Sequence, residues 1–293
     1  MGSGHREMLN GIILLWFVLT GLSVLFVAID IRSTPESPVL KWGFILLTAY
    51  TGPVGAFLYV LGCREPLPGT HEQYVKARWR QVLGSTMHCV AGDGVGILVG
   101  AVIGAIIHLP KPAEIGLEYL LGFGFGWTIF QALFMRDMAG GSYKSSLAST
   151  FIPELVSMNC LMAGMVPAMT LAMKAMPGSH DPKAAQFWFS MSMALLVGFI
   201  TAYPMNWWLV SNHLKHGMMT IRPREPGKEV EFKHQDGMQT MGSHRSGQHQ
   251  GVHGSSHTGE KLDSNVAIGP IITLSFLAFA IGLGVAGFLG AFH

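Results

Sequence analysis

Charged residues and cysteines are both scarce in this sequence, and each shortage excludes a class of protein. Only 12% of the 293 residues are charged, whereas soluble domains carry about 25%. The composition therefore predicts a membrane protein, and the net charge of +2 gives no reason to expect nucleic acid as a partner. The three cysteines lie within or beside apolar segments. A disulfide framework is therefore not expected, and the thiols are either packing residues or metal ligands.

Motifs of enzymes and of nucleotide-binding proteins are missing as well. The sequence contains no nucleophile paired with a base, no zinc-protease helix and no cofactor fingerprint. The glycine runs GDGVG and GFGFG lack the strand, loop and helix context of a phosphate-binding loop. We therefore expect no enzymatic activity, and any transport would be passive or coupled to an ion gradient.

Long apolar runs dominate the chain instead. They lie at residues 9–30, 40–62, 84–108, 115–135, 148–173, 185–209 and 266–291, and each is near the roughly 20 residues that a membrane-spanning helix needs. The sequence therefore predicts an all-α bundle of seven transmembrane helices. Its parts are two N-terminal helices in residues 1–63, an amphipathic interfacial segment in 64–83, a four-helix core in 84–210, a disordered loop in 211–265 and a last helix in 266–293.

Lysine and arginine determine the predicted orientation, because cytoplasmic loops are enriched in them. With seven spans, fourteen of these residues fall on the side of the N-terminus and five on the opposite side. We therefore expect a cytoplasmic N-terminus, a C-terminus outside the cell and a cytoplasmic location for the loop at 211–265.

The third apolar run begins STMHCVAGDGVGILVG and carries two stripes of small or polar residues. A glycine at every fourth position lets a neighbouring helix approach closely. Ser85, Cys89 and Asp93 form a second stripe about 100° away on the helix. The members of the glycine stripe are Gly92, Gly96, Gly100 and Gly104, and His88 continues it by the same step.

Four predicted helices bring polar side chains to one depth in the cytoplasmic leaflet. A carboxylate in the middle of a span costs about 2.5 to 3.5 kcal/mol on insertion scales, so such groups need partners and mark functional sites by default. The alternative is structural, with Arg136 paired to Asp93 or Glu154 and the amides holding helices together. The candidate metal ligands are His88, Cys89, Asp93, Glu154 and Met158, and the supporting polar network comprises Arg136, Asp137, Asn159 and Asn206.

A methionine stripe follows the fifth apolar run, where the residues repeat at steps of three or four and share one helix face. Thioether sulfur suits Cu(I), and a series of weak sites would let such an ion step along the helix. Methionine is also a common packing residue of protein cores, which is the alternative. The stripe consists of Met158, Met162, Met165, Met169, Met173 and Met176.

The polar segment between Ser211 and Asp263 contains seven of the thirteen histidines. Their irregular spacing is not that of a rigid zinc site, whereas His-rich tracts are typical of loose metal binding. The alternative is a linker whose histidines are incidental. We predict a cytoplasmic collector of metal ions that includes His244, His249, His253 and His257.

Five stretches of the central part carry a resemblance to a known family: STMHCVAGDGVGI, FGWTIFQALFMRDMAGGSY, FIPELVSMN, AYPMNWWLV and KHGMMT. Over residues 85 to 221 the chain resembles DUF4396, an uncharacterised family of bacterial integral-membrane proteins. The resemblance implies a multi-pass protein of the bacterial inner membrane and brings no established activity. In that family a second Cys often follows the His-Cys pair, and Asp93 stands at this position here, which implies a mixed His, Cys and Asp set.

Together these patterns predict an inner-membrane protein that binds and transports a soft transition metal, with Cu(I) as the expected ion. Two alternatives stay open: a non-catalytic accessory subunit of a respiratory or copper-enzyme complex, and a proton-coupled carrier of a small substrate with Asp93 or Glu154 as the proton carrier. The expected partners are the lipid bilayer, the metal ion and either another membrane protein or a second copy of this chain.

Overall fold

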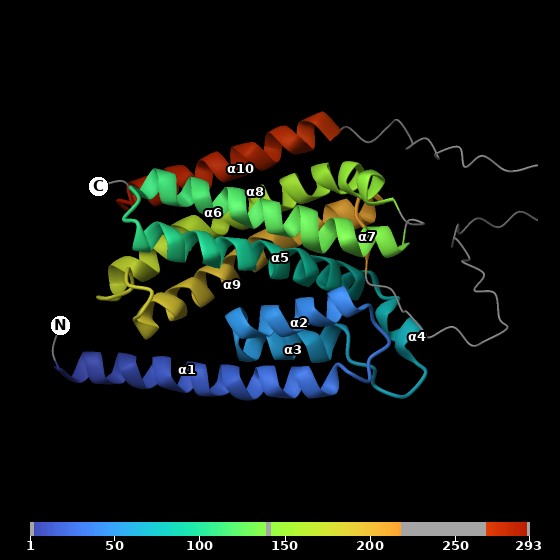
Figure 1. The fold of residues 1–293 in the computed structure, drawn as a ribbon, viewed down its shortest axis with the longest axis horizontal. Coiled ribbons are helices and arrows are strands. Elements are labelled where there is room, and N and C mark those ends of the chain that lie inside the picture. The colour runs from blue at the N-terminus through green and yellow to red at the C-terminus, as the bar shows by residue number, and fades with distance from the viewer. Residues whose placement is uncertain (1–2, 139–141, 218–267, 292–293) are drawn as a thin grey trace, which may run out of the picture. The chain divides into compact units, whose positions relative to one another are not determined.

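The computed structural model describes residues 3–138, 142–217 and 268–291, and these residues contain helices and no strand (Figure 1). Five of the described helices are long and apolar enough to cross a membrane. The predicted all-α class, with helices of membrane-spanning length, is therefore confirmed. The five are α1 (Ser3–Asp30), α5 (Arg78–Ile106), α8 (Tyr143–Ala175), α9 (Ala185–Ser211) and α10 (Ile268–Phe288).

A sixth rod contains the fourth apolar run. It consists of α6 (Lys111–Phe125), the π-helix η1 (Gly126–Gln131) and α7 (Ala132–Met138). The backbone keeps helical angles at both joints, Phe125 and Ala132, so the three elements are continuous. This rod lies beside α5 (Figure 1).

The second apolar run does not form the single span that its length predicts. It forms two helices, α2 (Pro38–Thr51) and α3 (Pro53–Gly62), which are separated at Gly52. Gly52 has a φ of 61°, a conformation that residues with a β-carbon rarely adopt, and Pro53 has no backbone N–H to continue the hydrogen bonds of α2. The two helices lie side by side in Figure 1 as a hairpin.

Hydrogen bonds define both ends of this hairpin. Near the end of α3, the Tyr59 hydroxyl lies 2.8 Å from Asp30 Oδ2, at the end of α1. At the tip, the Tyr50 hydroxyl donates to the carbonyl of Ala91, within α5, at 2.5 Å, and the Tyr50 carbonyl accepts from Ser192, within α9. The hairpin therefore enters the bundle and returns to the side from which it came.

In the described part of the chain, six rods traverse the bundle and both chain ends lie on one side. Asn10 in α1 contacts Gln186 at the start of α9 at 3.3 Å, and Lys174 near the end of α8 donates to the Leu289 carbonyl after α10. We call this side the terminal end and the opposite side, where α4 (His71–Val75) lies, the α4 end (Figure 1). The seven spans and the termini on opposite sides that the sequence predicts are not shown by the described residues, in which the hairpin takes the place of the second predicted span.

The central helices are shielded by the peripheral ones. Within the most apolar 18-residue stretch of each helix, 61% of the residues are buried in α5 and 67% in α8, against 17% in both α1 and α10. The exposed faces of α1 and α10 are rich in Leu, Ile and Phe side chains, as a lipid-facing surface requires. Polar groups on α5 and α8 are therefore kept away from the outer surface of the bundle.

The structure describes the whole of one predicted polar segment and only the start of the other. The proposed interfacial segment at 64–83 contains the short helix α4 and the first turns of α5. The His- and Met-rich loop lies outside the described residues from position 218 to 267. The predicted collector residues His244, His249, His253 and His257 all belong to this part.

Candidate metal centre

The glycine stripe of α5 packs directly on α6, as its spacing predicts. A β-carbon on Gly100 would lie 2.8 Å from the Cα of Glu118, and one on Gly104 would lie 2.8 Å from Cγ of Glu114. Both distances are too short for a side chain to fit, so each glycine is required for this close approach. Four levels of the two helices face each other: Gly104 with Glu114, Gly100 with Glu118, Gly96 with Gly122, and Gly92 with Gly126.

The level at Gly126 provides room for two carboxylates. A β-carbon on Gly126 would collide with Asp93 Oδ1, from α5, and would lie 2.5 Å from Glu154 Oε1, from α8. Gly126 is also the first residue of the π-helix η1, and single π turns inside α-helices are frequent at functional sites. The absence of a side chain at Gly126 therefore lets carboxylates from two other helices approach each other.

Cys89, Asp93 and Glu154 form a group that we call the inner cluster. Cys89 Sγ lies 3.1 Å from Glu154 Oε2 and 3.6 Å from Asp93 Oδ2. One ligand atom from each of the three residues lies within 4.8 Å of the others, and all three side chains are buried. Apart from the contact between the two carboxyl groups themselves, Asp93 Oδ1 and Glu154 Oε1 have no hydrogen-bond partner among the described residues. A buried polar atom without a partner is costly, so this site has unused capacity to bind a cation.

A chain of polar contacts connects the inner cluster to the α4 end. Ser157 Oγ lies 3.2 Å from Cys89 Sγ and accepts a hydrogen bond from Asn206 Nδ2 at 2.8 Å. Lys215 Nζ donates to Asn206 Oδ1 at 2.8 Å and lies 3.5 Å from Glu154 Oε2. Lys215, which follows α9, is buried. The cation that faces Glu154 is therefore Lys215, whereas Arg136, proposed for this role from the sequence, is exposed.

The structure brings some of the predicted residues into the inner cluster and leaves others outside. Asn206 lies within hydrogen-bonding distance of Ser157, beside the cluster. His88 remains on the glycine stripe, where its ring packs edge-on against Phe130 at 5.6 Å, because neighbouring helical residues point about 100° apart. Asn159 bonds to Tyr119 of α6 and to Ser275 of α10, and so connects helices instead of joining the cluster. The side chain of Asp137 is outside the described set.

The predicted methionine stripe lies inside the bundle. The methyl carbon of Met158 would lie 2.8 Å from a β-carbon on Gly122, one turn of α6 before the Gly126 level. At the other end of the stripe, Met173 Sδ lies 3.9 Å from Lys111 Nζ. This burial agrees both with core packing and with a sulfur-lined path. The buried members are Met158, Met162, Met165, Met169, Met173 and Met176.

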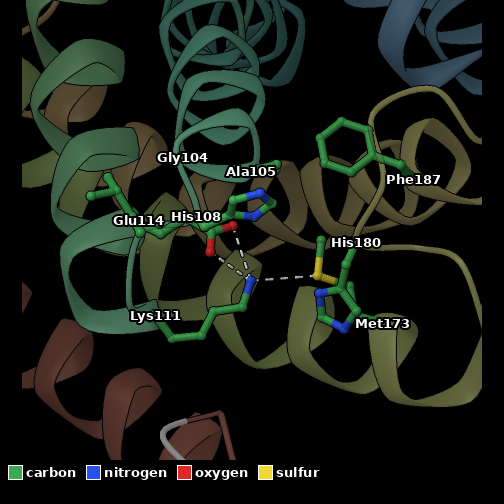
Figure 2. A pocket seen from close by; sticks show the side chains of 9 residues that line it. Gly104, Ala105, His108, Lys111, Glu114, Met173, His180 and Phe187 are labelled. Carbon is green, nitrogen blue, oxygen red and sulfur yellow. Dashed lines mark hydrogen bonds and ion pairs between the residues drawn. The ribbon is translucent and has the colours of Figure 1, made fainter.

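A cavity of about 230 Å³ lies where the stripe reaches the terminal end, and we call it the terminal pocket. Figure 2 shows the ammonium group of Lys111 between the carboxylate of Glu114 and the sulfur of Met173, with the ring of His180 beside it. Lys111 Nζ lies 2.8 Å from Glu114 Oε2. Partial burial and the charge of Lys111 lower the pKa of His180 below 6.5, so this imidazole stays neutral and able to bind a metal at neutral pH.

Sequence reasoning missed three residues that belong to this arrangement. Glu118 is buried between the terminal pocket and the inner cluster, and neither of its carboxylate oxygens has a partner among the described residues. The sequence did contain a pattern that points to Glu118, because Glu114, Glu118, Gly122 and Gly126 repeat every four residues along α6 and into η1. Ser157 and Lys215 carried no comparable pattern, and Lys215 lies in a segment whose composition predicted a disordered loop.

The fold and this site together define a helical protein with spans of membrane length around a buried thiol and carboxylate cluster. Residues 78–215 match the model of a family described as a domain of unknown function (DUF4396), which confirms the resemblance found in the sequence. The match begins with α5 and ends at Lys215, so it contains the whole inner cluster and its polar chain. No curated protein and no solved structure matches the chain.

Proposed function

We propose that this protein binds a transition-metal ion at the inner cluster and carries it across the membrane. The observation that supports this proposal is the inner cluster itself, in which a thiol and two carboxylates meet within 4.8 Å in a fully buried position. Groups of this kind are costly inside a membrane unless they bind a cation or one another. The absence of a nucleotide-binding motif favours transport that is driven by a gradient.

Charge and donor type favour a divalent ion such as Zn(II) at this position. Carboxylate oxygens suit divalent ions, whereas Cu(I) prefers several sulfur ligands, and the inner cluster contains only one sulfur. Metal binding deprotonates a thiol ligand, so Cys89, Asp93 and Glu154 would contribute three negative charges. A divalent ion and the Lys215 ammonium would neutralise them, and Cu(I) would leave one in excess. Copper, expected from the methionine stripe, stays a prediction.

Polar residues lead from the inner cluster toward both ends of the bundle. On the side of the α4 end, the ion would exchange ligands with Ser157 and Asn206, displacing the Lys215 ammonium. On the other side, Glu118 lies roughly 12 Å along α6 from the Gly126 level, at 1.5 Å per residue, and Glu114 opens into the terminal pocket. Protons released when the metal binds would move in the opposite direction, because carboxylates and thiols must be deprotonated to bind it.

The corrected topology also changes the proposed orientation. Of the Lys and Arg residues outside the segment 215–261, eight lie at the α4 end and four at the terminal end. The positive-inside rule then assigns the α4 end to the cytoplasm. Both termini would be outside the cytoplasm, in the bacterial inner membrane that the family resemblance implies.

Metal uptake into vesicles that contain the purified protein tests this proposal. We expect Zn(II) uptake above that of empty vesicles, and at least a tenfold loss in Cys89→Ser and Asp93→Asn. Cys160→Ser is the matched control, because Cys160 is a buried thiol outside the inner cluster. Equal uptake by all three variants would refute a role for the inner cluster. Preferential uptake of Cu(I) would overturn the charge argument in favour of the copper prediction.

A second candidate, the proton-coupled carrier of a small substrate, is favoured by Glu118. This carboxylate is buried with both oxygens unpartnered among the described residues. If it relays protons, Glu118→Gln would abolish a pH-driven proton flux that requires no metal, and Zn(II) binding would be unchanged. A flux that survives this substitution argues against the relay. The accessory-subunit role and the expected lack of enzymatic activity stay predictions.

A further inference from the structure

A second group of metal-ligating side chains lies at the α4 end, outside residues 78–215. Glu36 belongs to the loop between α1 and α2, Cys63 follows α3, and His71 begins α4. We call these three residues the hairpin cluster, because they meet where the α2–α3 hairpin opens. All three side chains are buried, and their ligand atoms lie within 4.8 Å of one another.

The distances in the hairpin cluster are close to those of a tetrahedral metal site. His71 Nε2 lies 3.5 Å from Glu36 Oε1, and Cys63 Sγ lies 3.9 Å from Glu36 Oε1 and 4.0 Å from His71 Nε2. With zinc bond lengths, tetrahedral ligands stand about 3.4 Å apart for nitrogen with oxygen and about 3.6 Å apart for sulfur with either. The His71 and Glu36 atoms are therefore already close to the required separation, and the two pairs that include Cys63 need to close by a few tenths of an ångström to share one ion.

The environment of the hairpin cluster leaves a ligand atom unused. Glu36 Oε2 has no hydrogen-bond partner among the described residues, although the side chain is buried. Burial raises the pKa of the Glu36 carboxyl and of the Cys63 thiol well above their usual values, and their proximity contributes to the shift at Cys63.

We propose that Glu36, Cys63 and His71 bind one zinc-class divalent ion. Sulfur, nitrogen and oxygen ligands are the set that proteins use for Zn(II), and three protein ligands leave a fourth position for water. Binding replaces the thiol and carboxyl protons, which leave to solvent. Because the ligands come from three separate segments, the ion fastens the open end of the hairpin to the end of α1 and to α4. This site is independent of the function proposed for the inner cluster.

Cobalt(II) spectroscopy on the full-length purified protein tests the hairpin cluster. Co(II) replaces zinc and gives an absorption band when a thiolate binds it. A Cys89→Ala background removes the inner thiol, so any remaining thiolate band has to come from another cysteine. We expect one equivalent of Co(II) with such a band, displaced by Zn(II), in this background and in Cys89→Ala with Cys160→Ser as the control.

Adding Cys63→Ser to the Cys89→Ala background should remove the band, and adding Glu36→Gln should weaken Co(II) binding at least tenfold. The Glu36→Gln change keeps the size of a buried side chain, so it serves as the second test if Cys63→Ser does not fold. A band that persists without Cys63, or its absence from the Cys89→Ala protein, would overturn the proposal. Neither result bears on uptake through the inner cluster, which is measured with Cys63 intact.

Discussion

Replacing Gly126 by alanine should separate the inner cluster without removing any of its ligands. The added β-carbon would lie 2.5 Å from Glu154 Oε1, about 0.9 Å short of an ordinary contact at 3.4 Å, and closer still to Asp93 Oδ1. Both carboxylates must therefore retreat by about 1 Å or more. Mutating the residues that only orient metal ligands typically costs 10- to 100-fold in affinity, so we expect a loss of at least this size in Zn(II) affinity for Gly126→Ala, which displaces the ligands themselves.

Gly124→Ala is the matched control, because a β-carbon on Gly124 would meet no atom within 4 Å. It lies in the same rod two residues earlier and should gain up to about 1 kcal/mol of helix stability with unchanged metal affinity. Gly126→Ala should instead lose about 1 to 3 kcal/mol from overpacking. Competition with a fluorescent zinc chelator measures the affinity and thermal unfolding measures the stability. Equal Zn(II) affinity in the two variants would refute the assignment of the inner cluster as the binding site.

Three further predictions concern stability. Lys215→Met should lower the free energy of unfolding by about 3 to 5 kcal/mol, because it leaves Glu154 buried without its cation. The double variant Lys215→Met with Glu154→Gln should lose less stability. Equal losses in the two variants would refute the pairing of Lys215 with Glu154. Gly52→Ala should lower the free energy of unfolding by at least 1 to 3 kcal/mol, because the added β-carbon would collide with Trp16 and Thr20 and Gly52 has a positive φ. Gly21→Ala is the control and should cause no such loss, because the space around Gly21 is open. The lowered pKa of His180 means that the folded chain binds fewer protons than the unfolded chain, so stability should fall as the pH drops below 6.5. In His180→Gln, the melting temperature should depend less on pH below 6.5. An unchanged dependence would show that other groups cause it.

Periodicity predicted the parts of the site that depend on one helix. The four-residue glycine repeat indicated the close packing of α5, and the same step placed Cys89 and Asp93 on one face, where the structure has them. Depth in the membrane was a weaker guide. It grouped His88 with Cys89 although the two side chains point in different directions around α5, toward Phe130 and toward Glu154.

The hairpin and Lys215 show why the rest could not be predicted. Residues 40–62 have the length and apolarity of a span, and only the Gly52–Pro53 pair signals that the helix breaks. Whether such a break kinks a helix or reverses it depends on long-range contacts such as Tyr59 with Asp30. Lys215 follows α9 in a polar segment, and its burial depends on a cavity formed by two other helices.

The α2–α3 hairpin touches the surroundings of both clusters, and Tyr50 lies at its tip. Its hydroxyl holds the carbonyl of Ala91, which lies in the helical turn between Cys89 and Asp93. The base of the same hairpin ends at Cys63, in the hairpin cluster. The hairpin therefore reaches from the hairpin cluster, at its base, to the turn of α5 that carries Cys89 and Asp93, at its tip.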